Sequence, residues 1–228
     1  MSAYERYVLP WLIHLAMRTN AATVERAHVV PDASGVVLEV GVGSGLNLPF
    51  YGPRVRRLYA LDPSPVLLRM ARRRAAQACV AVSWLEGSAE AIPLAEGTAD
   101  TVVTTWTLCT IPDPIRALRE MRRVLTPEGR VLFIEHGHSP DPSVAAWQAR
   151  LTPCWRRIAG GCQLDRRIAA LFADAGFELD SLSAGYGAGP RPFAYLYRGV
   201  ARPAHDGPAR PRSTCHECVT TKAPNHVG

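Results

Sequence analysis

Three glycines at every second position, Gly41, Gly43 and Gly45, follow an apolar, β-branched run at residues 36–40. Such a run is typical of a strand that is covered on both faces of a parallel sheet. The glycines give the turn after it the freedom to bring its backbone close to a ligand. A strand that leads into a glycine turn is an arrangement that binds nucleotide-type ligands. The sequence therefore predicts a cofactor site at residues 41–45.

Asp62 is the second candidate residue for binding that ligand. It ends another strand-like run, residues 57–61, and lies seventeen residues beyond Gly45. At roughly this offset a carboxylate accepts hydrogen bonds from ribose hydroxyls. A turn residue before Pro63 is the alternative role for Asp62. Leu46 stands where the dinucleotide motif G-x-G-x-x-G has its third glycine, which counts against NAD.

Strand-like and helix-like segments alternate along the chain, which indicates parallel strands joined by right-handed crossovers. We expect strands near residues 36–40, 57–61, 80–85, 101–105 and 129–135, and helices near 47–51, 65–78, 113–124 and 143–158. Two more apolar runs, residues 177–182 and 193–200, flank a glycine- and proline-rich segment and predict a hairpin with a long loop.

The candidate functional residues fall at the carboxyl ends of the expected strands, where open α/β sheets bind their ligands. Besides the glycine turn and Asp62, these residues are Ser88, Thr105 and His136. His136 is the one histidine at this edge, and because imidazole titrates near neutrality it is a candidate general base. Holding a loop is its alternative role.

Five segments resemble, in order, the successive motifs of class I S-adenosylmethionine-dependent methyltransferases. They are residues 39–45, 61–64, 86–94, 99–105 and 118–130. The resemblance covers approximately residues 35–200 and extends to the group that contains quinone C-methyltransferases and bacterial phospholipid N-methyltransferases. A closer resemblance, to thiol S-methyltransferases of the methyltransferase-like seven type, rests on residues 133–136, Trp147, Gln148, Leu151, Pro153, Trp155 and residues 160–166.

The resemblance implies an α/β fold of the Rossmann-like kind, with a seven-stranded, mostly parallel sheet, a C-terminal antiparallel strand beside the fifth, and helices on both faces. It also implies S-adenosylmethionine as cofactor. Glu39 would orient the methionine ammonium, the three glycines would pass beneath the methionine and ribose, and Asp62 would bind the ribose. The further cofactor-binding residues expected are Asn47, Pro63, Ser64, Ser88, Ala89 and Thr105. Ser88 departs from the family, which often has aspartate there to read the adenine amine.

Composition agrees with one enzyme domain. The chain has 228 residues, of which 47% are hydrophobic, so it can bury a sizeable core. The net charge of +6 comes from 25 arginines and one lysine spread in short groups, which are typical of solvated helix faces, and no nucleic-acid partner is expected. Six cysteines without a secreted-scaffold spacing favour a reducing cytoplasm.

No metal site is expected. Cys215 and Cys218 have the spacing of zinc ligands, but a structural zinc site needs four ligands and no second pair completes this one. Cys162 could be a metal or substrate thiolate. Packing as a small hydrophobe is the favoured role for it and for Cys109.

Both chain ends are expected to lie outside the main domain, which we place at residues 31–201. Residues 1–30 would form cap or lid helices, whose apolar stretch Val8–Met17 is too short to span a bilayer. That stretch would cap a pocket or make peripheral membrane contact. Residues 202–228 lack an apolar period and would form a flexible tail. The acceptor would bind against aromatic residues, namely Tyr7, Trp11, Trp106, Trp147 and Trp155.

These observations favour methyl transfer from S-adenosylmethionine to a small lipophilic acceptor, either a thiol sulfur or a phospholipid amine, with no obligate protein partner. A C- or O-methyltransferase of a quinone or secondary metabolite is one alternative. A catalytically idle nucleoside-binding protein is another, against which stands the intact set of Glu39, the glycines and Asp62. An NAD-dependent oxidoreductase is disfavoured by Leu46 and by the absence of a Tyr-x-x-x-Lys pair, since the one lysine is Lys222.

Overall fold

The computed structural model describes residue 4 and residues 7–204 of the chain. In this part a single sheet has seven strands in the order β3-β2-β1-β4-β5-β7-β6. The strands are β1 (Gly35–Val40), β2 (Val55–Asp62), β3 (Val82–Glu86), β4 (Ala99–Thr105), β5 (Leu125–His136), β6 (Phe177–Tyr186) and β7 (Tyr195–Pro203). Pairs among β1 to β5 are parallel, and β7 is antiparallel to both β5 and β6. The predicted Rossmann-like sheet, with its C-terminal antiparallel strand beside the fifth, is confirmed.

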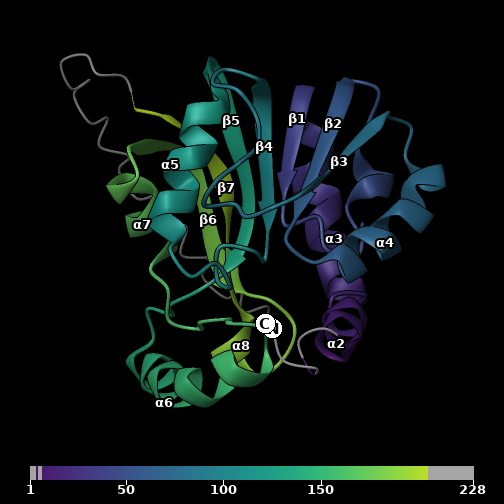
Figure 1. The fold of residues 1–228 in the computed structure, drawn as a ribbon. Coiled ribbons are helices and arrows are strands. Elements are labelled where there is room, and N and C mark those ends of the chain that lie inside the picture. The colour runs from purple at the N-terminus through teal and green to yellow at the C-terminus, as the bar shows by residue number, and fades with distance from the viewer. Residues whose placement is uncertain (1–3, 5–6, 205–228) are drawn as a thin grey trace, which may run out of the picture.

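Helices cover both faces of this sheet (Figure 1). They are α2 (Leu9–Ala16), α3 (Asn20–Val29), α4 (Pro65–Arg74), α5 (Pro114–Val124), α6 (Pro142–Ile158), α7 (Ile168–Asp174) and α8 (Arg191–Ala194). Three of them, α4, α5 and α6, begin with a proline that follows a capping side chain, respectively Ser64, Asp113 and Asp141. This pairing is favourable because the cap satisfies a free backbone N–H and proline has none to satisfy.

The structure departs from the predicted elements in several places, of which three bear on the site or the domain bounds. Residues 48–50 form a 3-10 turn, η2 (Leu48–Phe50), instead of a helix over 47–51. The seven-residue helix α7 was not predicted, because it is too short to show a helical period. The boundary predicted between residues 201 and 202 falls inside β7, where Arg202 forms an ion pair of 2.5 Å with Asp180. The rest of the predicted tail, including Cys215 and Cys218, lies outside the described residues.

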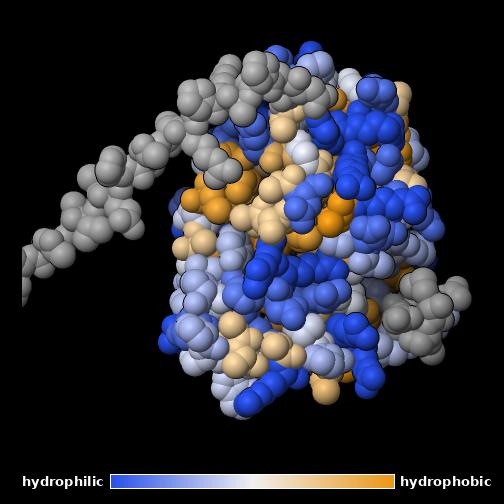
Figure 2. All heavy atoms as spheres, turned by 90° about the vertical axis from the view of Figure 1, so that its left-hand side faces the viewer, coloured by the Kyte–Doolittle hydropathy of each residue, from blue (hydrophilic) through white to orange (hydrophobic). Residues whose placement is uncertain are grey.

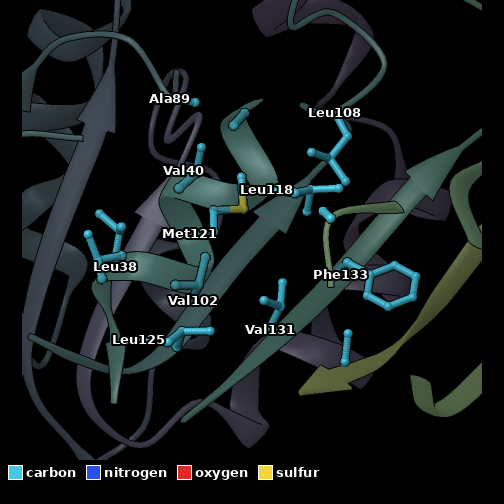
Figure 3. Packing of buried hydrophobic residues seen from close by; sticks show 14 of the residues in the cluster. Leu38, Val40, Ala89, Val102, Leu108, Leu118, Met121, Leu125, Val131 and Phe133 are labelled. Carbon is cyan, nitrogen blue, oxygen red and sulfur yellow. The ribbon is translucent and has the colours of Figure 1, made fainter. Parts of the chain in front are cut away.

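Alternating residues of the central strands form the core on the two faces of the sheet. On one face Leu38, Val102 and Val131 pack against α5 and α7 (Figure 3). On the other face their neighbours Val37 and Val103 pack with η2 and with the residues after α3. Since successive side chains of a strand point to opposite faces, burial of both sets explains the continuous apolar runs in the sequence.

Three helices, α2, α6 and α8, lie together at one end of the molecule, below the sheet in Figure 1. Among the described residues, no helix combines the length and the apolar character that crossing a membrane requires.

Hydrophilic residues cover much of the face in Figure 2, and the apolar areas on it gather in its upper half. Arginines of α5 such as Arg116 and Arg119 are exposed, as expected of a solvated helix face.

Candidate functional site

A large pocket lies between the carboxyl ends of the parallel strands and the helices α2, α6 and α8. Its volume is about 1590 Å³, whereas a pocket for one drug-sized ligand has about 300–1000 Å³. The glycine turn after β1, the ends of β2, β4 and β5, and apolar residues of all three helices contribute to its wall. The pocket therefore has room for a cofactor and a second ligand side by side.

The glycine turn lies in this wall with Gly41 and Gly43. Gly41 has φ of 74°, and a Cβ there would lie 2.3 Å from the hydroxyl oxygen of Thr107, so no other residue fits. Gly45 does not line the pocket. A Cβ at Gly45 would come within 3.0 Å of the Ala71 Cα, so this glycine allows the turn to pack on α4.

Asp62 is 4% exposed and lies at the pocket wall beside the glycine turn. Its carboxylate accepts hydrogen bonds from the backbone N–H groups of Gly43 (2.9 Å) and Ser64 (2.8 Å). Burial raises the pKa of Asp62 to about 6, and these two hydrogen bonds act in the opposite direction. Each carboxylate oxygen has two lone pairs, so Asp62 fixes the turn and keeps acceptor capacity for a ligand hydroxyl.

Glu39 is fully buried beneath the turn and does not itself line the pocket. It accepts hydrogen bonds from the Asn47 amide nitrogen (2.9 Å) and the Tyr51 hydroxyl (2.8 Å). Burial raises the pKa of Glu39 to about 7, although both hydrogen bonds favour its charged form. Glu39 therefore does not contact the pocket itself and is linked to it by its hydrogen bond with Asn47.

Asn47 presents an unsatisfied acceptor to the site. Its amide nitrogen donates to Glu39 and to the hydroxyl of Thr105 (3.0 Å), which fixes the orientation of the amide. Its oxygen is buried and has no hydrogen-bond partner. Because a buried polar atom without a partner costs about 1–3 kcal/mol, the oxygen marks a position where a ligand donor is missing.

The remaining residues predicted to bind the cofactor, Pro63, Ser64, Ser88, Ala89 and Thr105, all line the pocket. The Ser64 hydroxyl caps α4 by accepting from the Leu67 N–H (3.3 Å). The Ser88 hydroxyl oxygen accepts from the Glu90 N–H (3.1 Å), which leaves its own hydrogen to donate. Ser88 therefore offers the pocket both a donor and an acceptor.

Arg26 is a pocket residue that the sequence did not indicate. Its side chain is buried, stacks 4.9 Å above the Trp106 ring and donates to the Met17 carbonyl (3.0 Å). Burial lowers its pKa to about 10, and its Nε has no partner. In sequence it is one of many helical arginines, which are usually solvated, so only the tertiary structure reveals it.

Trp106 has φ of 51° and lies in the pocket wall directly after β4. This left-handed conformation costs a bulky residue about 1–3 kcal/mol and persists where the surroundings impose it, often at functional sites. Its backbone N–H donates to the Ile134 carbonyl (2.7 Å), and the Arg26 guanidinium covers its ring. Both contacts hold the indole against the cavity.

His136, Cys109 and Cys162 form a buried cluster in the same wall, with one donor atom of each within 4.8 Å of the others. The His136 Nε2 lies 3.1 Å from the Cys162 sulfur, and the Trp155 indole N–H donates to that sulfur over 3.2 Å. The neighbouring Cys109 thiol, followed by His136, lowers the pKa of Cys162 to about 5. The pKa of Cys109 is raised, first by its interaction with Cys162 and then by burial.

The aromatic residues predicted to contact the acceptor divide into two groups. Trp106 and Trp155 line the pocket, and Trp155 packs on Phe193 of α8 at 4.7 Å between ring centroids. Tyr7, Trp11 and Trp147 are each more than half exposed and lie outside the wall. Sequence reasoning could not separate the groups because the orientation of α2 and α6 decides which of their faces meets the cavity.

The helix α2 is connected to the cofactor turn by a histidine that the sequence did not single out. The Nδ1 of His14 lies 2.7 Å from the Ser44 hydroxyl, and both side chains are buried. Its Nε2 lies 3.3 Å from the Arg74 guanidinium. The expected lid and the glycine turn are therefore in direct contact.

A Rossmann-like sheet with a glycine turn after β1 and an acidic residue ending β2 is an arrangement that binds nucleotide-type ligands. Residues 38–133 match a protein family described as a methyltransferase domain. The chain is 39% identical over 142 residues to a human thiol S-methyltransferase, TMT1B, covering 59% of this chain and 57% of that protein. It is 35% identical over 104 residues to phosphatidylethanolamine N-methyltransferase of Cereibacter sphaeroides, covering 45% of this chain and 51% of the relative.

The fold also matches a solved S-adenosylmethionine-dependent methyltransferase from Methanosarcina mazei. The TM-score is 0.60 at 17% identity, and the match covers 76% of this chain and 93% of that one. Residues 38–133 thus match a methyltransferase domain, and the sheet that contains them has the Rossmann-like fold of that solved structure. It spans little more than half the length of the two curated relatives.

Proposed function

We propose that this chain transfers the methyl group of S-adenosylmethionine to a lipophilic thiol. The observation that carries the proposal is that one pocket joins the glycine turn and Asp62 to an apolar wall from α2, α6 and α8. The likeness to the human thiol S-methyltransferase supports the sulfur acceptor. Phospholipid amines and quinones are the alternative acceptors.

The cofactor half of the pocket fits S-adenosylmethionine in its unsatisfied groups. The free Asn47 oxygen suits the methionine ammonium, and the spare lone pairs of Asp62 suit the ribose hydroxyls. Arg26 is the cation in the wall that suits the methionine carboxylate. When bound, the cofactor supplies a methyl group on a positively charged sulfur.

The acceptor half favours an uncharged molecule. The acidic residues among the described wall residues are Glu25 and Asp62. Glu25 is paired with Arg198 at 2.6 Å, and Asp62 lies in the cofactor half of the pocket, beside the glycine turn. An ammonium acceptor would thus lose its hydration without gaining a free carboxylate, which is costly. Leu9, Leu12 and Ile13 of α2 would instead contact an alkyl chain.

The chain's own residues would position the acceptor and exclude water. Methyl transfer is an in-line displacement, so alignment of the acceptor sulfur with the methyl group supplies much of the acceleration. The apolar wall keeps the reacting atoms dry. His136 lies at the end of β5 in the same wall, and its imidazole is the candidate group there to take the acceptor proton.

The outward side of α2 presents a second apolar surface, with Tyr7, Trp11 and Leu15 all more than half exposed. A lipophilic acceptor partitions into membranes, and short apolar helices lie on their surface. Peripheral membrane contact through this side of α2 would bring the chain to the acceptor's source.

The test is turnover with S-adenosylmethionine and an alkyl thiol, an alkylamine, a phosphatidylethanolamine vesicle and a phenol, with the methylated product of each acceptor measured by mass spectrometry. The thiol should be the preferred acceptor. Ile13→Ser should raise the acceptor KM roughly 10- to 150-fold, because burying this side chain is worth roughly 1.5–3 kcal/mol. Leu15→Ser is the matched control, since Leu15 lies on the same helix but outside the wall. Methylation of the amine or phenol alone would refute the thiol assignment.

A further inference from the structure

The cluster of Cys109, His136 and Cys162 has the composition of a metal site. Two thiols and one imidazole are soft ligands that suit zinc. Their donor atoms lie within 4.8 Å of one another, and all three residues are at most 9% exposed. In a tetrahedral site with Zn–S near 2.3 Å and Zn–N near 2.0 Å the ligand atoms lie about 3.5 Å apart, so small side-chain adjustments would close this cluster around an ion.

The fold places these three residues together through rigid elements. Cys109 follows β4, His136 ends the adjacent strand β5, and the two strands pair in parallel. The Gln163 N–H donates to the Cys109 carbonyl over 2.9 Å, which holds Cys162 beside Cys109. The Trp155 indole donates to the Cys162 sulfur, a contact of the kind that orients metal ligands.

We propose that Cys109, His136 and Cys162 bind a zinc ion whose fourth coordination position faces the acceptor pocket. Three protein ligands with one open position are the mark of a catalytic zinc site, and two cysteines with one histidine are a known ligand set for it. All three residues line the pocket, so the open position faces the space where an acceptor lies. The identity of that fourth ligand as a thiol rests on the proposed function.

A zinc ion would also balance the negative charge of the thiolates in this site. Two thiolates would place two negative charges in a buried wall that also contains the Glu135 carboxyl, and the nearby Arg166 guanidinium supplies one positive charge. Arg166 is itself fixed by donating to the carbonyls of Leu108 and Ile111. A divalent cation supplies the missing positive charge.

The ion would change the chemistry of the acceptor step. As the acceptor thiol binds, its proton leaves to solvent and a zinc–sulfur bond forms. The acceptor sulfur then bonds to the methyl carbon as the carbon–sulfonium bond breaks, which yields a thioether and S-adenosylhomocysteine. A neutral thioether binds zinc more weakly than a thiolate and leaves. In this account His136 holds the ion and does not take the proton.

The first experiment measures zinc binding to the full chain with both Cys215→Ser and Cys218→Ser, which removes the other pair with metal-ligand spacing. After dialysis against Zn²⁺, inductively coupled plasma mass spectrometry should find one zinc per chain. Adding Cys109→Ser or Cys162→Ser should weaken binding more than about 100-fold in a chelator competition, since losing even an outer-shell partner costs roughly 10–100-fold. Cys154→Ser, at an exposed cysteine of α6, should bind as the background does. Circular dichroism and S-adenosylhomocysteine affinity verify that the variants fold.

The second experiment replaces zinc with Co²⁺, whose absorption reports thiolate ligation and tetrahedral geometry. An alkyl thiol should shift the thiolate-to-cobalt band, and the matching alcohol should not. Absence of zinc, equal binding by the cysteine variants, or a disulfide between Cys109 and Cys162 in its place would each overturn the site. An unchanged cobalt spectrum with thiol would overturn the open position. Thiol methylation without metal would overturn the zinc site and leave the proposed function standing. Zinc binding without thiol methylation would overturn the proposed function and leave the zinc site standing.

Discussion

Cofactor affinity should depend on pH through Asp62. Burial raises its pKa to about 6, yet ribose hydroxyls need the charged form as acceptor. If only the ionised carboxylate binds, the affinity for S-adenosylhomocysteine should fall about tenfold between about pH 7.5 and pH 5. Near pH 6 binding should release about half a proton per chain, because half of the Asp62 groups are protonated before binding.

Glu39 could add to this dependence. Its pKa is about 7, so a requirement for its charged form would contribute roughly a further hundredfold at about pH 5. Adenosine separates the two carboxyl groups, because it lacks the amino-acid portion and should keep only the tenfold effect of Asp62. Glu39→Gln should likewise retain the effect of Asp62 and remove any excess.

The assay is calorimetric titration across this pH range in two buffers of different ionisation enthalpy, which counts the protons released. Asp62→Asn should bind S-adenosylhomocysteine about 30–150-fold more weakly at neutral pH. Two charge-assisted hydrogen bonds to the ribose, each worth about 1.5–3 kcal/mol, become neutral ones, and each loses about 1–1.5 kcal/mol. Its remaining affinity for adenosine, which isolates the effect of Asp62, should be independent of pH. A wild-type affinity that is constant from about pH 5 to 7.5, or an Asp62→Asn variant with the wild-type slope, would refute the assignment of Asp62.

The expected loss of affinity at low pH is not caused by unfolding that results from protonation of Asp62. Its pKa is about 6 in the folded chain and about 3.8 when unfolded. The folded state therefore binds the proton more tightly, and the stability that this supplies is fully present below about pH 4 and lost as the pH rises through 6. Acidification to about pH 5 makes the contribution of Asp62 to folding more favourable, so a loss of affinity there reports on the site.

Two further predictions concern how the turn is held. His14→Ala removes the 2.7 Å contact with Ser44 and should weaken S-adenosylhomocysteine binding roughly two- to tenfold in calorimetry, the value of one net hydrogen bond. His28→Ala, which removes only a contact within α3, should have no effect, and equal losses in the two variants would contradict the link between α2 and the turn. Gly45→Ala should lower the free energy of unfolding by about 1–3 kcal/mol in urea, because φ is +79° and a Cβ meets Ala71. The control is Gly52→Ala, because a Cβ there meets nothing within 4 Å. If the Gly45→Ala chain were as stable as the Gly52→Ala chain, the turn would relax without cost and the prediction would be wrong.

The sheet and the cofactor turn were predictable because local sequence determines them. Buried parallel strands leave continuous apolar runs, and the turn needs glycine at Gly41 whatever surrounds it. Asp62 and Asn47 could be placed because they lie a few residues from a strand end, and strand ends share one edge of the sheet. The pairing of β7 with β5 came from the family resemblance, since antiparallel insertion leaves no local pattern.

Arg26 and His14 could not be predicted, because burial alone distinguishes them from solvated residues of the same kind. Arg26 looks like any helical arginine until α3 is packed beside Trp106. His14 lies in an apolar helix whose sequence does not say which face meets the turn. Both side chains act across elements, and the relative position of elements is the part of the fold that a local pattern does not contain.

The cysteines show the same limit for metal chemistry. Local spacing drew attention to Cys215 and Cys218, whereas the cluster in the pocket joins residues 26 or more positions apart. Its members meet because β4 and β5 are neighbours in the sheet, which brings Cys109 and His136 to one edge, and because the chain after α6 returns to pair with Cys109. A metal site of this kind is visible in sequence only after strand order is known. The useful sequence signal is then a cysteine just after the fourth strand together with a histidine ending the fifth, a pair that parallel pairing of those strands must bring close.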